Sequence, residues 1–156
     1  MDIEIQRGTL DDLGLLMEWR MRVLHEVFSI PPDDAMTELE RENRAYYQAA
    51  LPTERHIACF ANVDSQIVGC GGVCIYQEMP SPDNPSGQCA YLMNIYTLPV
   101  FRGQGVGGAV VRWLIGQAEQ RGITKIYLET SESGRPLYQK LSFTDMGGYM
   151  YHRKTK

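Results

Sequence analysis

The chain has 156 residues, of which 44% are hydrophobic, and a formal net charge of −4. This length and apolar content fit one packed domain spanning residues 1–156. The negative charge argues against nucleic acid as a general partner. The chain also lacks a run of 18 apolar residues, which argues against a membrane span or a membrane partner.

The four cysteines, Cys59, Cys70, Cys74 and Cys89, lie in apolar, strand-like contexts and form no C-x-x-C pair. They are expected to be buried reduced thiols of a cytoplasmic protein. No histidine or carboxylate lies at metal-ligand spacing beside them, so no metal site is predicted.

A strand and two helices are predicted in the first third of the chain. Residues 1–7 alternate polar and apolar side chains, which indicates a strand and not a signal peptide. Thr9 is a suitable N-cap for the first helix, which Pro31-Pro32 would end. A second helix is predicted from residue 33 to about residue 50, where Pro52 closes it.

The middle of the chain is predicted to be rich in strands. Residues 56–61 and 67–76 read as an antiparallel hairpin with its turn at residues 63–66. Three prolines mark residues 79–87 as a loop, and residues 89–97 form the next predicted strand.

The last third is predicted to alternate helices and strands. A helix follows the glycine-rich stretch and runs to about Arg121, with Gly122 as its C-cap. A strand at 125–130 and a short helix at 136–140 come next, and residues 143–153 would supply one or two final strands. The sequence therefore predicts one mixed α/β domain.

Four glycines gather between Arg102 and Gly108, after a strand-like run and before a helix-like one. A glycine-rich turn at a helix start leaves backbone N–H groups unpaired, and the helix dipole adds partial positive charge there. This arrangement favours a phosphate group.

The same stretch satisfies G-x-G-x-x-G through Gly103, Gly105 and Gly108, with Glu129 ending the next strand. A nicotinamide-dependent enzyme is therefore one alternative. Against it, the segment around Pro99 separates strand from turn, and the 27 residues after Glu129 are too few for a second nucleotide-binding half.

The wider pattern Pro99-x-x-Arg102-Gly103-x-Gly105-x-Gly107 resembles R/Q-x-x-G-x-G/A, the acyl-CoA-binding signature of the GNAT superfamily of N-acetyltransferases. Residues 137–143, LYQKLSF, are similar to its second hallmark, L-Y-x-x-x-G-F, with Ser142 in place of the glycine. The resemblance implies a GNAT-like α/β (α+β) fold. Its mixed, mostly antiparallel central sheet is flanked by helices and splayed at the strand preceding the glycine-rich turn.

The resemblance also implies acetyl-CoA as cosubstrate and no metal. The backbone of the strand before the turn would pair with the pantetheine arm, and the turn would hold the pyrophosphate. Ser131 occupies the position of an asparagine that contacts the cofactor in this family. The implied binding residues are Ile95, Tyr96, Thr97, Arg102, Gly103, Gln104, Gly105, Val106, Gly107, Gly108 and Ser131.

Acetyl transfer to an amine poses two proton problems. An alkyl amine has a pKa near ~10.4, so only about one molecule in 2,500 is neutral at pH 7 and a proton must be removed. By resemblance, Tyr138 would be the general acid that protonates the leaving thiolate. Glu129 is the first candidate for the base, although it could equally be an exposed carboxylate at a strand end, and Glu78 is the second.

Asn94 and Tyr96 would share one strand face and position the amine or a water, while Met93 and Ile95 would enter the core.

The resemblance places the acceptor between the first two helices and the hairpin loops. Arg20 or Arg22 could meet an acceptor carboxylate, or both could be solvated. Acidic residues of the second helix could attract a cationic amine or keep the surface soluble. A small-molecule amine is favoured over a peptide N-terminus or a lysine side chain.

A catalytically silent acyl-CoA-binding module is an alternative from another class. A homodimer through the C-terminal strands, using Tyr149–Tyr151, is also possible.

Overall fold

The computed structural model describes residues 1–154. Its strands and helices follow one another in this order: β1 (Glu4–Gly8), the short 3-10 helix η1 (Leu10–Asp12), α1 (Leu13–Val27), α2 (Thr37–Ala50), β2 (His56–Val63), β3 (Gln66–Gln77), β4 (Gln88–Thr97), the short 3-10 helix η2 (Pro99–Phe101), α3 (Val106–Gln120), β5 (Lys125–Leu128) and α4 (Arg135–Lys140).

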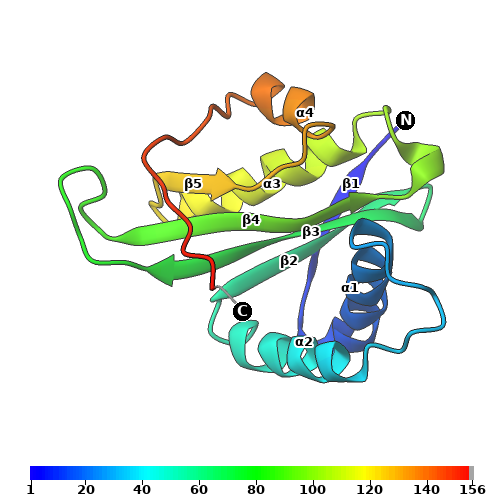
Figure 1. Ribbon diagram of the computed structural model, residues 1–156. Coiled ribbons are helices and arrows are strands. Elements are labelled where there is room, and N and C mark those ends of the chain that lie inside the picture. The colour runs from blue at the N-terminus through cyan, green and yellow to red at the C-terminus, as the bar shows by residue number, and fades with distance from the viewer. Residues whose placement is uncertain (155–156) are drawn as a thin grey trace.

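The strands form one sheet in the order β1-β2-β3-β4-β5. Neighbours from β1 to β4 are antiparallel, whereas β4 and β5 are parallel. Helix α3 covers one face of this sheet, and α1 and α2 cover the other (Figure 1). The mixed, mostly antiparallel fold expected from the sequence is confirmed.

The splay of the sheet is also visible in the strand pairing. Strand β4 pairs with β5 only from Cys89 to Leu92, opposite Lys125 to Leu128. It then continues to Thr97 while still paired with β3. The edge of β4 beyond Leu92 that would face β5 is therefore unpaired, which leaves backbone N–H and C=O groups open to an extended ligand.

Local hydrogen bonds determine where the helices of the first third of the chain begin. The N–H of Thr9 donates to Asp12 Oδ2 at 2.8 Å, and η1 leads directly into α1. Helix α2 begins at Thr37, four residues later than predicted. The reason is local, because Asp34 Oδ1 accepts a 2.9 Å hydrogen bond from the Met36 N–H and Met36 has a left-handed φ of 45°.

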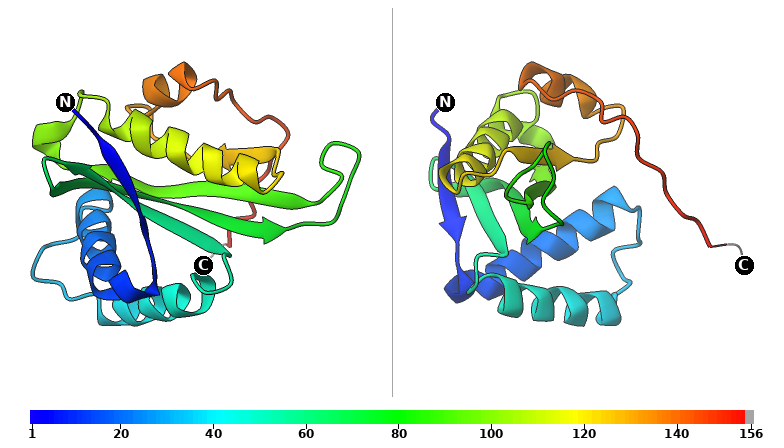
Figure 2. Two further views of the ribbon diagram at one scale, coloured as in Figure 1. Left: turned by 180° about the vertical axis from the view of Figure 1, so that it is seen from behind. Right: turned by 90° about the vertical axis from the view of Figure 1, so that its left-hand side faces the viewer.

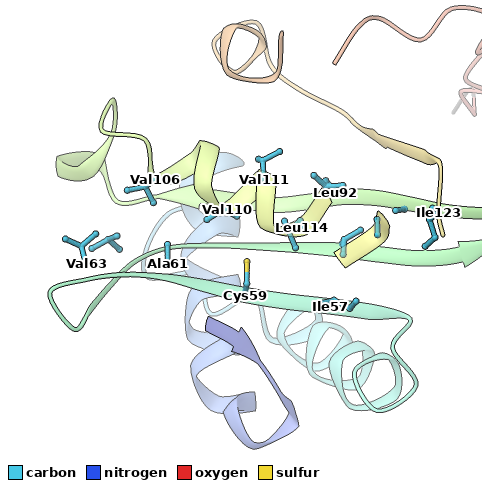
Figure 3. Close-up of a cluster of buried hydrophobic side chains, with 14 residues drawn as sticks. Ile57, Cys59, Ala61, Val63, Leu92, Val106, Val110, Val111, Leu114 and Ile123 are labelled. Carbon is cyan, nitrogen blue, oxygen red and sulfur yellow. The ribbon is translucent and has the colours of Figure 1, made fainter. Parts of the chain in front are cut away.

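The main core lies between the sheet and α3 (Figure 3). Val110 and Leu114 of α3 are fully buried against Ile57 and Leu92 of the sheet. Gly71 of β3 permits this close packing, because a Cβ there would lie 2.5 Å from Val110 Cγ1. All four cysteines are free, and only Cys74 is partly exposed.

The predicted C-terminal strands are wrong: residues 143–153 form no strand. Gly148 has a φ of 85°, which interrupts extended backbone, and the carboxylate of Asp145 pairs with the Arg135 guanidinium. Tyr149, Met150 and Tyr151 are 66%, 100% and 87% exposed, and Lys125 Nζ lies 5.7 Å from the centroid of the Tyr149 ring. The segment runs away from α4 along the outside of the molecule (Figure 2).

No helix within residues 1–154 combines the length and apolar character that crossing a bilayer demands.

Candidate functional site

The glycine-rich turn presents a row of unpaired donors. Gly103 and Gly105 have φ angles of 76° and 91°, a region that only glycine enters freely, and Gly105 is the N-cap of α3. Within the part of the chain that the structure describes, no backbone N–H from Gly103 to Gly108 donates a hydrogen bond. The first N–H that does so is that of Ala109, to the Gly105 carbonyl at 3.1 Å. Six consecutive free donors at a helix start fit a pyrophosphate.

The unpaired edge of β4 leads to this turn. Tyr96 and Thr97 pair with Cys70 and Gly69 of β3 on one side, and their other side faces the gap left by β5. The Thr97 carbonyl accepts a 2.9 Å hydrogen bond from Arg102 Nε. The predicted pantetheine-binding strand and phosphate-binding turn are therefore continuous in space.

Arg102 is held by the protein's own groups. Its Nη2 donates at 2.9 Å to Glu26 Oε1, and the hydroxyl of Tyr96 donates to the other oxygen of Glu26. The Tyr96 hydroxyl, followed by Arg102, holds the pKa of Glu26 below its ordinary value, against the opposing effect of desolvation. The guanidinium thus lies beside the turn but already has a carboxylate partner.

Helix α4 packs against the start of α3. A Cβ at Gly107 would lie 3.1 Å from Leu137 Cδ2, so the two helices are in close contact there. The next residue, Tyr138, stacks edge-to-face on Phe143 with ring centroids 5.8 Å apart. Burial raises the pKa of the Tyr138 phenol. The raised pKa keeps the phenol protonated at neutral pH, and within residues 1–154 its hydroxyl has no hydrogen-bond partner, so it is free to donate.

Tyr138 and Glu129 line the same cavity of about 560 Å³, between β5, α4 and residues 142–146. Glu129 is exposed and lies one residue beyond the end of β5. The structure therefore brings the predicted acid and the first candidate base together. It leaves the glycine turn and β4 outside this cavity.

Two other predicted groups have protein partners. Ser131 lies in the loop before α4, and its hydroxyl is 3.0 Å from that of Ser133. Glu78 Oε1 accepts a 2.7 Å hydrogen bond from Lys125 Nζ, which lowers the pKa of Glu78. Glu78 is not among the residues that line the cavity of Tyr138 and Glu129.

Strand β4 contains a bulge that the sequence did not reveal. Cys70 and Gly72 of β3 pair with Tyr96 and Met93, so two steps along β3 correspond to three along β4. Asn94 has a φ of 59° in this bulge. Met93 and Asn94 consequently point to the same side, toward α1 and α2. The expectation that Met93 enters the core with Ile95 is wrong for Met93, because the bulge breaks the alternation.

A second cavity, of about 220 Å³, lies on that side. It is lined by Arg20, Asn43, Tyr46, Tyr47, His56, Cys74, Met93 and Asn94. These residues come from α1, α2, β2, β3 and β4. The resemblance placed the acceptor against the first two helices, which include Asn43, Tyr46 and Tyr47, but it assigned these side chains no individual role. His56 and Cys74 had no predicted role, because no local pattern marks side chains that meet only after folding.

The walls of the second cavity are aromatic and held in place. The hydroxyl of Tyr46 lies 2.8 Å from His56 Nδ1 and 3.0 Å from Cys74 Sγ. The imidazole packs edge-on against Tyr46 and Tyr47, with ring centroids 5.2 Å and 5.5 Å apart. Burial, aided by the charge of Arg20, lowers the pKa of His56 to about 4. The imidazole is therefore neutral at pH 7.

The chain matches the model of the "Acetyltransferase (GNAT) family" over residues 15–143. It therefore belongs to the GNAT family of acetyltransferases, enzymes that transfer an acetyl group from acetyl-CoA. This assignment confirms the resemblance inferred from the two motifs.

Solved structures show the same fold. A predicted acetyltransferase from Clostridium acetobutylicum, crystallised with acetyl-CoA, is 26% identical, with 97% of this chain and 96% of that chain covered and a TM-score of 0.85. A GCN5-related N-acetyltransferase from Ralstonia eutropha JMP134 is 21% identical over 97% and 99% of the two chains, with a TM-score of 0.80.

A more distant structure contains AAC(6')-Iy with a bisubstrate analogue, CoA-S-monomethyl-acetylneamine. It is 16% identical over 100% of both chains, with a TM-score of 0.76. No curated protein matches this chain.

Proposed function

We propose that this acetyltransferase acts on the primary amine of a small molecule that binds in the second cavity. The observation that carries the proposal is the opening of β4 away from β5 directly after Leu92. It places an open strand edge between the free donors of the glycine turn and the cavity beside Met93 and Asn94. A cavity of about 220 Å³ suits a small acceptor better than a folded protein surface.

In this proposal the backbone N–H groups of residues 103–108 bind the pyrophosphate, with Arg102 at their side. The open edge of Ile95, Tyr96 and Thr97 pairs with the amides of the pantetheine arm. Ser131 supplies a hydroxyl from the loop before α4. These contacts use backbone groups almost throughout, so the strand edge and the turn decide binding more than side-chain identity does.

The reaction we propose is direct attack. The neutral amine nitrogen attacks the thioester carbonyl carbon, a C–N bond forms, and the C–S bond breaks as the tetrahedral intermediate collapses. Tyr138 donates its phenolic proton to the departing sulfur, and solvent later returns the proton. The raised pKa of Tyr138 keeps the acid protonated before the reaction.

The amine must also lose a proton, and Glu129 is our candidate for the base. Its exposed carboxylate shares a cavity with Tyr138. Among residues 1–154, no carboxylate lines the second cavity. A water chain would therefore connect the bound amine to Glu129.

The test is acetyl-CoA binding by calorimetry, followed by thiol release over a panel of amines, with NADH as the control ligand. Micromolar acetyl-CoA binding with turnover of small amines supports the proposal. Binding without turnover of any amine would identify a silent acyl-CoA-binding module instead. Turnover of peptides alone would identify a peptide N-acetyltransferase.

We further propose that residues 1–156 act as one cytoplasmic domain that forms a homodimer through the exposed Tyr149–Tyr151 segment. Exposed apolar surface of this kind is typical of a contact between protein chains.

A further inference from the structure

Arg20 is a cation without an anionic partner in the part of the chain that the structure describes. Its Nε donates to Asn43 Oδ1 and its Nη1 to Asn94 Oδ1, both at 2.9 Å. Both acceptors are neutral amides. No carboxylate within residues 1–154 lies within the 4.0 Å that defines an ion pair with this guanidinium.

Three of the neighbouring carboxylates are paired with other arginines. Glu26, six residues further along α1, pairs with Arg102. On α2, Glu38 pairs with Arg41 and Glu40 with Arg44. Arg22 stacks over the ring of Trp19, with its guanidinium carbon 4.5 Å from the ring centroid. Among residues 1–154, no acidic side chain lines the second cavity, and Arg20 is the only charged residue in its wall.

The two asparagines fix the guanidinium in one orientation. Asn43 Nδ2 donates to the Leu39 carbonyl at 2.8 Å, which turns Oδ1 toward Arg20. Asn94 is positioned by the β4 bulge. A guanidinium has five N–H donors, of which these bonds use two. One N–H on Nη1 and both on Nη2 therefore remain, and together they match the two oxygens of a carboxylate.

The environment of Arg20 strengthens its interaction with a bound carboxylate. Arg20 is half-buried beside Tyr46, Tyr47 and Met93, and an ion pair is screened less at such a position than on the open surface. The single positive charge of Arg20 complements a ligand that carries a single negative charge. It also repels a second positive charge on the ligand, as polycationic amines carry.

We propose that Arg20 binds a carboxylate of the acceptor, so that the acceptor is a small amino carboxylate. This inference rests on the proposed function, and it adds the chemical class of the substrate. The carboxylate meets Nη1 and Nη2 of Arg20, and the aromatic walls contact the carbon chain. The amine is left free near Met93 and Asn94, where β4 parts from β5.

The test compares ω-amino carboxylates of increasing length with their primary amides and with ω-aminoalkyl phosphates. In these series the amine is the same and only the far end changes. The enzyme variants are Arg20→Gln and Arg20→Lys, and Arg22→Gln is the matched control because Arg22 stacks on Trp19 and lies outside the cavity. Thiol release gives kcat and KM, and calorimetry gives the acetyl-CoA affinity.

We expect the wild type to prefer the best carboxylate over its amide by at least about tenfold in kcat/KM. Arg20→Gln should reduce this preference to less than about threefold, chiefly by raising KM, with acetyl-CoA affinity retained. Arg20→Lys should retain part of the preference for the carboxylate over the amide, and Arg22→Gln should retain the whole preference. Equal use of carboxylate and amide, a preference for the phosphate, or the same loss in Arg22→Gln would overturn the proposal.

A second measurement separates this inference from the proposed function. If acetyl-CoA binds but no amine is acetylated, the transfer reaction is at fault and not the Arg20 assignment. Calorimetric titration of the ω-amino carboxylates into the CoA-bound protein then shows whether Arg20 binds their carboxylate. Binding to the wild type that is lost in Arg20→Gln supports the carboxylate site, and absence of binding to the wild type rejects it.

Discussion

The hydroxyl of Tyr46 lies 2.8 Å from Nδ1 of His56, which is only 3% exposed. This contact joins α2 to the first residue of β2 and closes the wall of the second cavity. The opposite ring nitrogen, Nε2, has no hydrogen-bond partner within residues 1–154. The imidazole is thus a buried neutral group whose protonation the folded state opposes.

This burial predicts a loss of stability in acid. The pKa of His56 is lowered from 6.5 to about 4, first by burial and then by Arg20. Between these values the unfolded chain binds a proton that the folded chain does not, so the free energy of unfolding falls as pH falls from 6.5 through 4. The contribution should total about 3 kcal/mol. Urea unfolding across this pH range measures it.

His56→Gln should flatten that pH dependence, because the amide does not titrate. The control is His152→Gln, since His152 is exposed in the C-terminal segment. An unchanged pH slope in His56→Gln would show that His56 is not the group responsible.

Tyr138→Phe should lower kcat at least about tenfold, since general acid catalysis contributes roughly 100-fold or more. The ring and its packing on Phe143 are retained, so acetyl-CoA affinity should change little. Tyr127→Phe is the control, because Tyr127 lines the same cavity but has no proposed role. Undiminished turnover in Tyr138→Phe would remove Tyr138 as the acid.

Gly107→Val should abolish acetyl-CoA binding while the fold survives. The new side chain lies among the free N–H donors, and its Cβ would lie 3.1 Å from the movable end of Leu137. Gly116→Ala is the control on the same helix, where an added Cβ has nothing within 4 Å. It should leave binding intact and raise stability by roughly 0.5–1 kcal/mol. Calorimetry and thermal unfolding test both variants, and retained binding in Gly107→Val would reject the pyrophosphate site.

Because the C-terminal segment exposes apolar side chains, we expect the protein to dimerise through it. Introducing negative charge into this segment should dissociate the dimer. Replacing Met150 and Tyr151 with glutamate should shift the protein from dimer to monomer in analytical ultracentrifugation. Met79→Glu is the control, because Met79 is 88% exposed in the loop between β3 and β4. A wild type that is monomeric at every concentration would contradict the homodimer.

The sequence predicted most elements because their boundaries are set by neighbours in the chain. The cap at Thr9 and the left-handed glycines Gly105 and Gly122 act over one turn. The first helix ends at Val27, before Pro31, because the backbone already turns left-handed at Ser29. The two family motifs are equally local, and they led to the correct family. The C-terminal strands failed for the converse reason, since Tyr149–Tyr151 have a strand-like composition but no neighbouring strand.

By itself, the sequence determined the order of elements, the glycine turn and the acetyl-CoA chemistry of this chain. The tertiary structure alone decided what surrounds the acceptor. Arg20 and Asn94 are 74 positions apart, yet they share a hydrogen bond. The bulge that turns Met93 and Asn94 to one side exists only because β4 pairs with β3 around Gly71. Periodicity along a chain cannot report such an extra residue, because register is a property of two strands and not of one.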